Sequence, residues 1–277
     1  DATLWIKQNT SEDAVIASWW DYGYWITTLS DRTTIADNAT LIDWQINKLA
    51  YTLITTPDNS WHILNSHYTE DISQYLGDET ILAFGGDLES EFITNFRNDN
   101  NGKDCEQIFK ADAQKLGDGT LEESCNPVTK GMDADYFLIY LAGERIYTEG
   151  IEMPFYTLEG GGDESKKTWF TKISNHQMSK YIESDNITPT KFYMENTTLG
   201  MLTPFTIFKY VEPNTGRTFD TFQNGLIPVY IHDLKFKDPE TDPFYLVYAS
   251  PSFYSQEPGI MSAVLIYKIN HDYNPQN

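Results

Sequence analysis

The apolar segments of this chain are short, and this feature limits its fold more than any other. The longest uninterrupted one, Tyr136–Ala142, has seven residues, whereas a membrane-spanning helix needs roughly 18 or more. With 40% hydrophobic residues in a chain of 277, a sizeable core can still be buried. The sequence therefore predicts one large or two smaller globular domains built from short elements. The chain opens with Asp-Ala-Thr-Leu-Trp and no secretion signal, so we expect a fragment of a longer protein.

Helical and strand patterns divide the chain near residue 205. Before that point, strands are expected at 14–18 and 133–140, and helices at 40–55, 60–76 and 163–183. After it, four strand-like segments separated by Gly, Pro and Asp turns are expected at 205–211, 229–236, 244–249 and 263–269. We therefore predict an α+β fold. Residues 1–205 form a mixed α/β central core with a surface insertion at 97–130, and residues 206–277 form a smaller antiparallel, β-rich unit.

The charge and the cysteines exclude several classes of partner. A formal net charge of −22 argues against a nucleic-acid partner and against electrostatic docking on anionic lipid, because both need a positive face. The two cysteines, Cys105 and Cys125, enclose a short polar loop, and we expect them to form a disulfide. With no other thiols, we do not expect a zinc site built from cysteines.

One aromatic segment stands out: Trp19-Trp20-Asp21-Tyr22-Gly23, at the end of the first predicted strand. A helix is expected to begin near Tyr24, so the pentapeptide should form a turn, and Gly23 should allow a sharp or left-handed step. Neighbouring side chains of an extended chain point to opposite sides, so at least one Trp should lie at a surface or in a groove. The alternative is an aromatic core plug in which Asp21 only caps the next helix.

The three residues Trp19, Trp20 and Asp21 have complementary hydrogen-bonding roles. An indole N–H only donates and an ionised carboxylate only accepts, while a hydroxyl does both. A turn with these three side chains can therefore saturate one Ser or Thr hydroxyl. Ala or Val in its place would leave the site groups unpaired.

The segment from Leu4 to Ile26 resembles the start of the globular domain of the oligosaccharyltransferase catalytic subunit, whose hallmark is Trp-Trp-Asp-Tyr-Gly. This family occurs in eukaryotes, archaea and some bacteria, and the chain is most similar to the archaeal AglB type. The resemblance implies that the domain follows a multi-pass membrane region and lies on the extracytoplasmic side. It also implies that Trp19, Trp20 and Asp21 bind the hydroxyl at position +2 of the acceptor sequon Asn-X-Ser/Thr.

A second family motif, Asp-X-X-Lys-X-X-X-Met/Ile on a kinked helix, has a counterpart at Asp163, Lys166 and Phe170. On a helix, these residues and Ile173 fall within an arc of about 80°. The resemblance implies that they support the pocket together with Tyr22 and Gly23. Phe170 replaces the expected Met or Ile, which affects how a Thr methyl group would pack. The alternative is an ordinary Asp–Lys pair on the surface of a helix.

The resemblance implies a glycosyltransferase that moves a lipid-linked oligosaccharide onto Asn of acceptor polypeptides. In the full-length enzyme a divalent metal, Mn or Mg, would be held by membrane-proximal loops that this fragment lacks. We therefore expect neither catalytic nor metal-binding residues in this domain, and no activity from the domain alone. Two alternatives from other classes are a secreted carbohydrate-binding module and a surface-layer structural domain.

Overall fold

The computed structural model describes most of the chain outside the predicted insertion. The described residues are 1–39, 43–67, 131–147, 154–158, 160–174 and 176–275. The insertion at 97–130, with the predicted disulfide between Cys105 and Cys125, lies outside them. No helix of the described part is long and apolar enough to cross a membrane.

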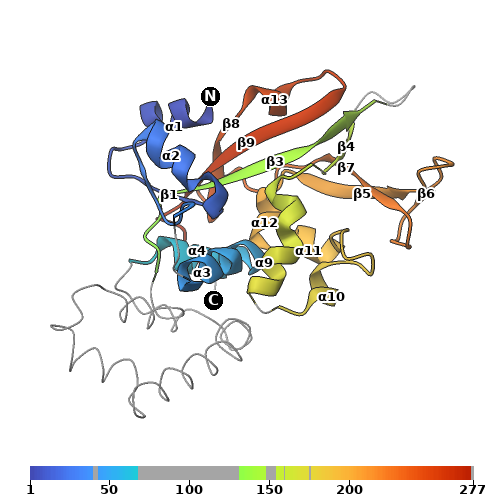
Figure 1. Cartoon of the computed structure of the whole chain (residues 1–277), viewed down its shortest axis with the longest axis horizontal. Coiled ribbons are helices and arrows are strands. Elements are labelled where there is room, and N and C mark those ends of the chain that lie inside the picture. Colours follow the sequence, from blue (N-terminus) through green and yellow to red (C-terminus); the bar gives the residue numbers. More distant parts are fainter. Residues whose placement is uncertain (40–42, 68–130, 148–153, 159, 175, 276–277) are drawn as a thin grey trace, which may run out of the picture.

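In the described residues, nine strands form one mixed sheet (Figure 1). Seven run in the order β2-β1-β3-β4-β7-β5-β6, and β9 and β8 extend the sheet from β3. Strands β2, β1 and β3 pair in parallel, and all other pairs are antiparallel. The strands are β1 (Val15–Ser18), β2 (Thr33–Thr34), β3 (Tyr136–Ile146), β4 (Phe155–Thr157), β5 (Phe205–Val211), β6 (Thr218–Phe219), β7 (Ile227–His232), β8 (Phe244–Ala249) and β9 (Gly259–Ile269).

Helices cover both faces of the sheet around β1, β3 and β9 (Figure 1). On one face, α1 and α2 bury a small cluster around Ile6, Ile26 and Leu138. On the other face, the larger core includes residues of α3, α4, α9, α11 and α12. The helical segments are α1 (Ala2–Asn9), η1 (Trp20–Tyr22), α2 (Gly23–Ser30), α3 (Asp43–Ile54), α4 (Pro57–Asn65), η4 (Asp163–Lys166), α9 (Lys167–Ile173), α10 (Met178–Tyr181), α11 (Lys191–Asn196), α12 (Thr198–Leu202) and α13 (Pro251–Tyr254).

The predicted mixed α/β fold is confirmed. Its longest strand pairing joins β3 to β9 from Tyr136↔Lys268 to Arg145↔Gly259, so strands from both predicted units share one sheet. The boundary near residue 205 stays a prediction.

The predicted strand at 229–236 is wrong at its C-terminal end, because β7 stops at His232. The chain leaves the sheet there, and the Lys235 ammonium donates to the carbonyl oxygens of Gly200, Thr203 and Phe205. These carbonyls lie in and just after α12, so Lys235 satisfies acceptors that the helix leaves free.

A gap in the sheet positions the site. One edge of β3 pairs with β1 at residues 136–138 and with β4 at residues 144–146. Between these pairings, the Asp163 carboxylate accepts the backbone N–H of Tyr140, at 2.8 Å. Gly162 passes so close to β3 that a Cβ there would lie 2.6 Å from the backbone nitrogen of Ala142. The segment 162–163 therefore occupies the place of a neighbouring strand, next to the end of β1.

Candidate functional site

The Trp-Trp-Asp-Tyr-Gly segment forms a tight turn at the end of β1. Its residues Trp20–Tyr22 make a single 3₁₀ turn, closed by the Tyr22 N–H donating to the Trp19 carbonyl. Trp19 is buried with 6% exposure, whereas Trp20 and Asp21 are half-buried. The two neighbouring Trp side chains thus have different environments, as the sequence predicts.

Gly23 serves a different purpose from the one expected. Its backbone is ordinary right-handed helix, with φ −55° and ψ −45°, so the predicted left-handed step is wrong. Gly23 is instead required by space, because a Cβ there would collide with the carbonyl oxygen of Ala36 and the backbone of Asp37. The glycine lets α2 begin directly against the segment that follows β2.

The structure brings the two predicted motifs into direct contact through Lys166. Its ammonium donates to Asp21 Oδ2 at 2.7 Å and to the Tyr22 hydroxyl at 2.9 Å. It also lies 3.5 Å from Asp163 Oδ1. The Tyr22 hydroxyl in turn donates to Asp163 Oδ1 at 2.8 Å. Four polar side chains from η1 and η4 therefore form one continuous network.

Asp163 is the buried anchor of this network. Its side chain is 1% exposed, so the alternative of a surface Asp–Lys pair on a helix is wrong. Burial raises the pKa of the Asp163 carboxyl, while Lys166 and the hydrogen bonds from Tyr140 and Tyr22 act in the opposite direction. Burial and the neighbouring Asp163 also raise the pKa of Tyr22, so its hydroxyl remains a proton donor at neutral pH.

Phe170 lies under the turn and does not face solvent. Its ring is fully buried and meets the Trp19 indole edge-on, at 4.7 Å between centroids. Ile173, on the same face, is partly buried against the large core. The predicted continuous helix 163–183 is wrong: η4 and α9 end at Ile173, where both the N–H and the hydroxyl of Ser174 donate to the Phe170 carbonyl.

The turn keeps polar groups free for a ligand. Asp21 is 34% exposed, and its carboxylate uses only Oδ2, toward Lys166. Among the described residues, neither Asp21 Oδ1 nor the indole N–H groups of Trp19 and Trp20 have a hydrogen-bond partner. Asp21 does not cap α2 either, since that helix has no side-chain cap. The arrangement offers one acceptor and two donors on three consecutive residues of one turn.

Sequence reasoning missed two parts of the site. Tyr140 supplies the backbone N–H that Asp163 accepts, and its ring lies against that of Tyr22, at 6.0 Å. Glu164 and Lys167 form a second ion pair of 2.8 Å, in which both side chains are 4% exposed. The register of two i,i+3 pairs, 163–166 and 164–167, is visible in the sequence, but their burial is not.

Among the described residues, no three His, Cys, Asp or Glu side chains are grouped so that they could hold a metal ion. The described residues of the site offer hydrogen-bonding groups and aromatic surface to a ligand.

Part of the chain is similar to proteins of known family. Residues 11–116 match the family model described as the STT3/PglB/AglB core domain. Over 97 residues, the chain is 33% identical to the dolichyl-diphosphooligosaccharide–protein glycosyltransferase subunit STT3 of Saccharomyces cerevisiae, covering 35% of this chain and 13% of that protein. It is 34% identical over 103 residues to subunit STT3B of Arabidopsis thaliana, covering 37% of this chain and 12% of that protein. The aligned part is thus a small fraction of these relatives' length.

Two solved structures are also similar. The C-terminal domain of C. jejuni PglB aligns over 97% of this chain and 99% of its own, with 14% identity and a TM-score of 0.33. The C-terminal globular domain of an oligosaccharyltransferase from Archaeoglobus fulgidus aligns over 84% and 94%, with 11% identity and a TM-score of 0.29. The family model covers less than half of the chain. Over that part the chain is homologous to the STT3 subunits and similar to the STT3/PglB/AglB core domain.

Proposed function

We propose that this chain is the domain of an oligosaccharyltransferase that holds the Ser or Thr at position +2 of the acceptor sequon Asn-X-Ser/Thr. Trp19, Trp20 and Asp21 are the binding residues. The observation that carries the proposal is the set of free groups on the turn, namely Asp21 Oδ1 and two indole N–H groups. Lys166 already holds the other oxygen of the same carboxylate, Oδ2.

In this proposal, the acceptor hydroxyl donates to Asp21 Oδ1 and accepts from the indole N–H groups. Lys166 holds Asp21 through Oδ2, so the carboxylate is oriented before the acceptor arrives. An acceptor with Val in place of Thr has nearly the same shape but would leave Oδ1 and the indoles unpaired in a partly buried site. Holding position +2 fixes the distance to the reacting Asn, which is a proximity effect.

The complete enzyme is proposed to transfer a lipid-linked oligosaccharide to the Asn side chain, on the extracytoplasmic side of an archaeal membrane. The names of the aligned relatives support the glycosyltransferase class. The divalent metal, Mn or Mg, would be held by residues outside this chain and would supply Lewis-acid chemistry there. The isolated domain is accordingly proposed to bind acceptors without transferring glycan.

The first prediction tests Asp21 in the full-length enzyme. Asp21→Ala should lower transfer to an Asn-X-Thr peptide by orders of magnitude, because the hydroxyl loses its acceptor and Lys166 loses its nearest counter-charge. Initial transfer rates measure the effect, and a circular dichroism melt checks that the variant folds. Asp13→Ala, which removes an exposed carboxylate elsewhere, is the matched control and should transfer normally. Near-normal turnover of Asp21→Ala would remove Asp21 from the site.

The isolated 277-residue chain gives an independent measurement. In NMR titrations, an Asn-X-Thr peptide should shift the indole N–H signals of Trp19 and Trp20, and an otherwise identical Asn-X-Val peptide should shift them far less. Equal shifts with both peptides would contradict recognition of the hydroxyl.

A further inference from the structure

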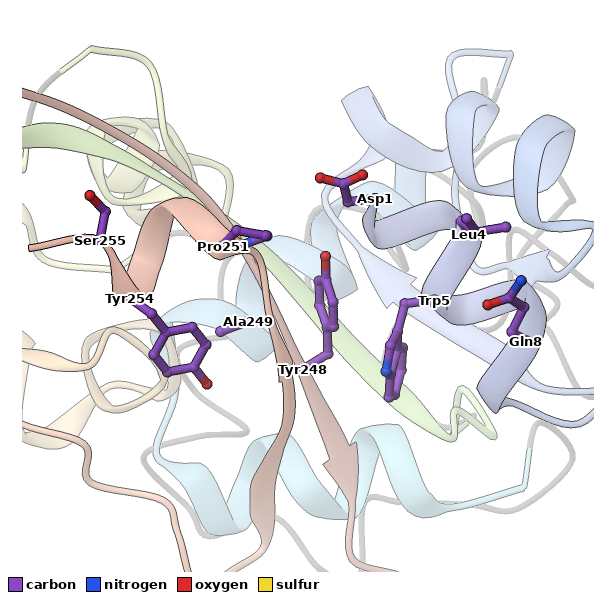
Figure 2. A pocket seen from close by; sticks show the side chains of 9 residues that line it. All are labelled: Asp1, Leu4, Trp5, Gln8, Tyr248, Ala249, Pro251, Tyr254 and Ser255. Atoms are coloured by element: carbon purple, nitrogen blue, oxygen red, sulfur yellow. The ribbon is translucent and has the colours of Figure 1, made fainter.

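A cavity of about 630 Å³ lies away from the acceptor site, between α1, the end of β8 and α13 (Figure 2). Asp1, Leu4, Trp5 and Gln8 line one wall, and their spacing places them on one face of α1. None of the lining residues belongs to the Asp21–Lys166 network. Its volume lies in the range of small-molecule binding pockets.

Aromatic rings dominate the wall of this cavity. The Trp5 indole packs against the Tyr248 ring, with centroids 5.2 Å apart and planes tilted by 32°. Figure 2 shows Tyr248 between Trp5 and Tyr254. Tyr254 is 62% exposed and Leu4 is 55% exposed. The cavity thus presents ring faces that nothing in the described chain covers.

Polar groups accompany the rings. The side chains of Asp1 and Gln8 have no hydrogen-bond partner among the described residues. The Tyr248 hydroxyl is buried and also lacks a partner there, and Ser255 adds a hydroxyl to the lining. A purely apolar occupant, such as a hydrophobic helix, would leave these groups unpaired at a cost.

The charge of the side chains that line the cavity further limits the class of ligand that it can bind. The side chains of its lining include no Lys, Arg or His and one carboxylate, so they offer no cationic group to a phosphate or another anion. A single carboxylate does not make a cation site either. A neutral ligand with apolar faces and hydroxyl groups on its edge fits both the rings and the unpaired polar groups. A pyranose ring has this character, because its axial C–H bonds form a face that packs on an aromatic ring.

We propose that the cavity formed by α1, β8 and α13 binds a neutral sugar, with Trp5, Tyr248 and Tyr254 packing on its ring and Asp1 and Gln8 accepting or donating to its hydroxyls. If this sugar is part of the glycan of the transfer reaction, that assignment rests on the proposed function. The argument that the cavity binds a neutral sugar does not rest on it.

The test uses the 277-residue chain labelled at its indole nitrogens. Maltotriose, triacetylchitotriose and a mannotriose are titrated to millimolar concentration, and at least one should shift the Trp5 indole signal saturably. Tyr254→Ala should weaken that binding about fivefold or more, because it removes a ring that the protein itself does not bury. Gln8→Ala is a second variant and should also weaken it. Tyr24→Ala, which removes a similarly exposed Tyr on α2, is the control and should leave it unchanged.

Three results would overturn the proposal: no saturable shift with any of the sugars, equal losses in Tyr254→Ala and Tyr24→Ala, or a Trp5 response to acceptor peptide and not to sugar. The Asp21→Ala chain separates this site from the acceptor site. If it loses peptide binding and keeps sugar binding, both proposals stand. If peptide binding is absent in the unchanged chain while sugar binding is present, only the proposed function fails.

Discussion

At the scale of single residues, one hydroxyl joins the two motifs of the proposed acceptor site. Tyr22 belongs to the Trp-Trp-Asp-Tyr-Gly turn, yet its hydroxyl donates to Asp163 and accepts from Lys166 in the second motif. The carboxylate it serves is 1% exposed. Losing a donor to a buried carboxylate costs more than losing a bond at the surface, because water cannot replace the donor. The Tyr22 hydroxyl therefore stabilises the folded domain as well as positioning Lys166 and Asp163.

Tyr22→Phe should lower the free energy of unfolding by about 1–3 kcal/mol, since it leaves Asp163 with one hydrogen bond fewer. Urea unfolding at neutral pH measures this. Tyr24→Phe is the control two positions along the chain, where the side chain is 57% exposed, and it should change stability little. If both variants lose the same free energy of unfolding, the Tyr22 hydroxyl contributes no more to stability than the exposed hydroxyl of Tyr24 does.

At the scale of elements, η4 and α9 carry two ion pairs of the same spacing with different surroundings. Lys166 lies at the proposed acceptor site and is 22% exposed, whereas Lys167 pairs with Glu164 where both are 4% exposed. Removing one partner of a buried pair is costly. Asp163, although 1% exposed, keeps its hydrogen bonds from the Tyr140 N–H and the Tyr22 hydroxyl when Lys166 is removed. Two neighbouring lysines should therefore separate binding from folding.

Lys167→Ala should lower the free energy of unfolding by about 3 kcal/mol or more, because the buried Glu164 carboxylate loses the counter-charge that lies 2.8 Å away. Lys166→Ala should lower it by less than half as much and should instead weaken Asn-X-Thr binding, because Asp21 loses its positioning donor. Unfolding and peptide titrations on the same two variants give the comparison. Unfolding of the domain by Lys166→Ala would favour a structural role for that residue.

The start of α2 allows a prediction about backbone approach. Gly23→Ala places a methyl group against the backbone carbonyl of Ala36. The new Cβ is attached to one backbone and the carbonyl oxygen to another, so relieving the collision requires a shift of main chain and not of a side chain. The gain in helix propensity from Gly to Ala, about 1 kcal/mol, is too small to offset such a collision. We expect a net loss of stability in thermal unfolding, with Thr28→Ala on the exposed face of α2 as the unaffected control. A stabilised Gly23→Ala variant would contradict the close approach.

At the scale of the whole molecule, local patterns predicted the elements and missed how they meet. Short apolar runs predicted β5 and β8 with their bounds, because strand ends there coincide with turn residues. The sequence could not predict that Asp163 occupies a gap between β1 and β4, since that position depends on the pairing of β3 with β1, more than a hundred residues away in the sequence, as well as with β4. Nor could it predict that Phe170 is buried under Trp19. Composition and spacing identify the two motifs. The burial of each residue, which only the structure gives, separates the residues that support the turn from those that face a ligand.

A half-buried histidine makes the stability of the whole molecule depend on pH. The His176 ring packs on Tyr51 and Tyr181, and burial lowers the pKa of the imidazole to about 4. In the unfolded chain the pKa is about 6.5. Above that value neither state is protonated. As the pH falls from about 6.5 toward about 4, the unfolded chain takes up a proton that the folded one refuses, so folding loses stability in this window.

Replacing His176 should remove this part of the acid sensitivity. Between about pH 7.5 and about pH 5, the unchanged chain should lose roughly 2 kcal/mol more unfolding free energy than His176→Gln does. Urea unfolding at the two pH values gives the difference, and the other histidines cancel because both chains keep them. His62→Gln, at a half-buried position on α4 where burial also lowers the pKa, is the comparison and should remove less of the sensitivity. His176→Gln could instead lose as much stability between the two pH values as the unchanged chain does. The His176 imidazole would then take up its proton in the folded state, which would contradict close packing of the ring against Tyr51 and Tyr181.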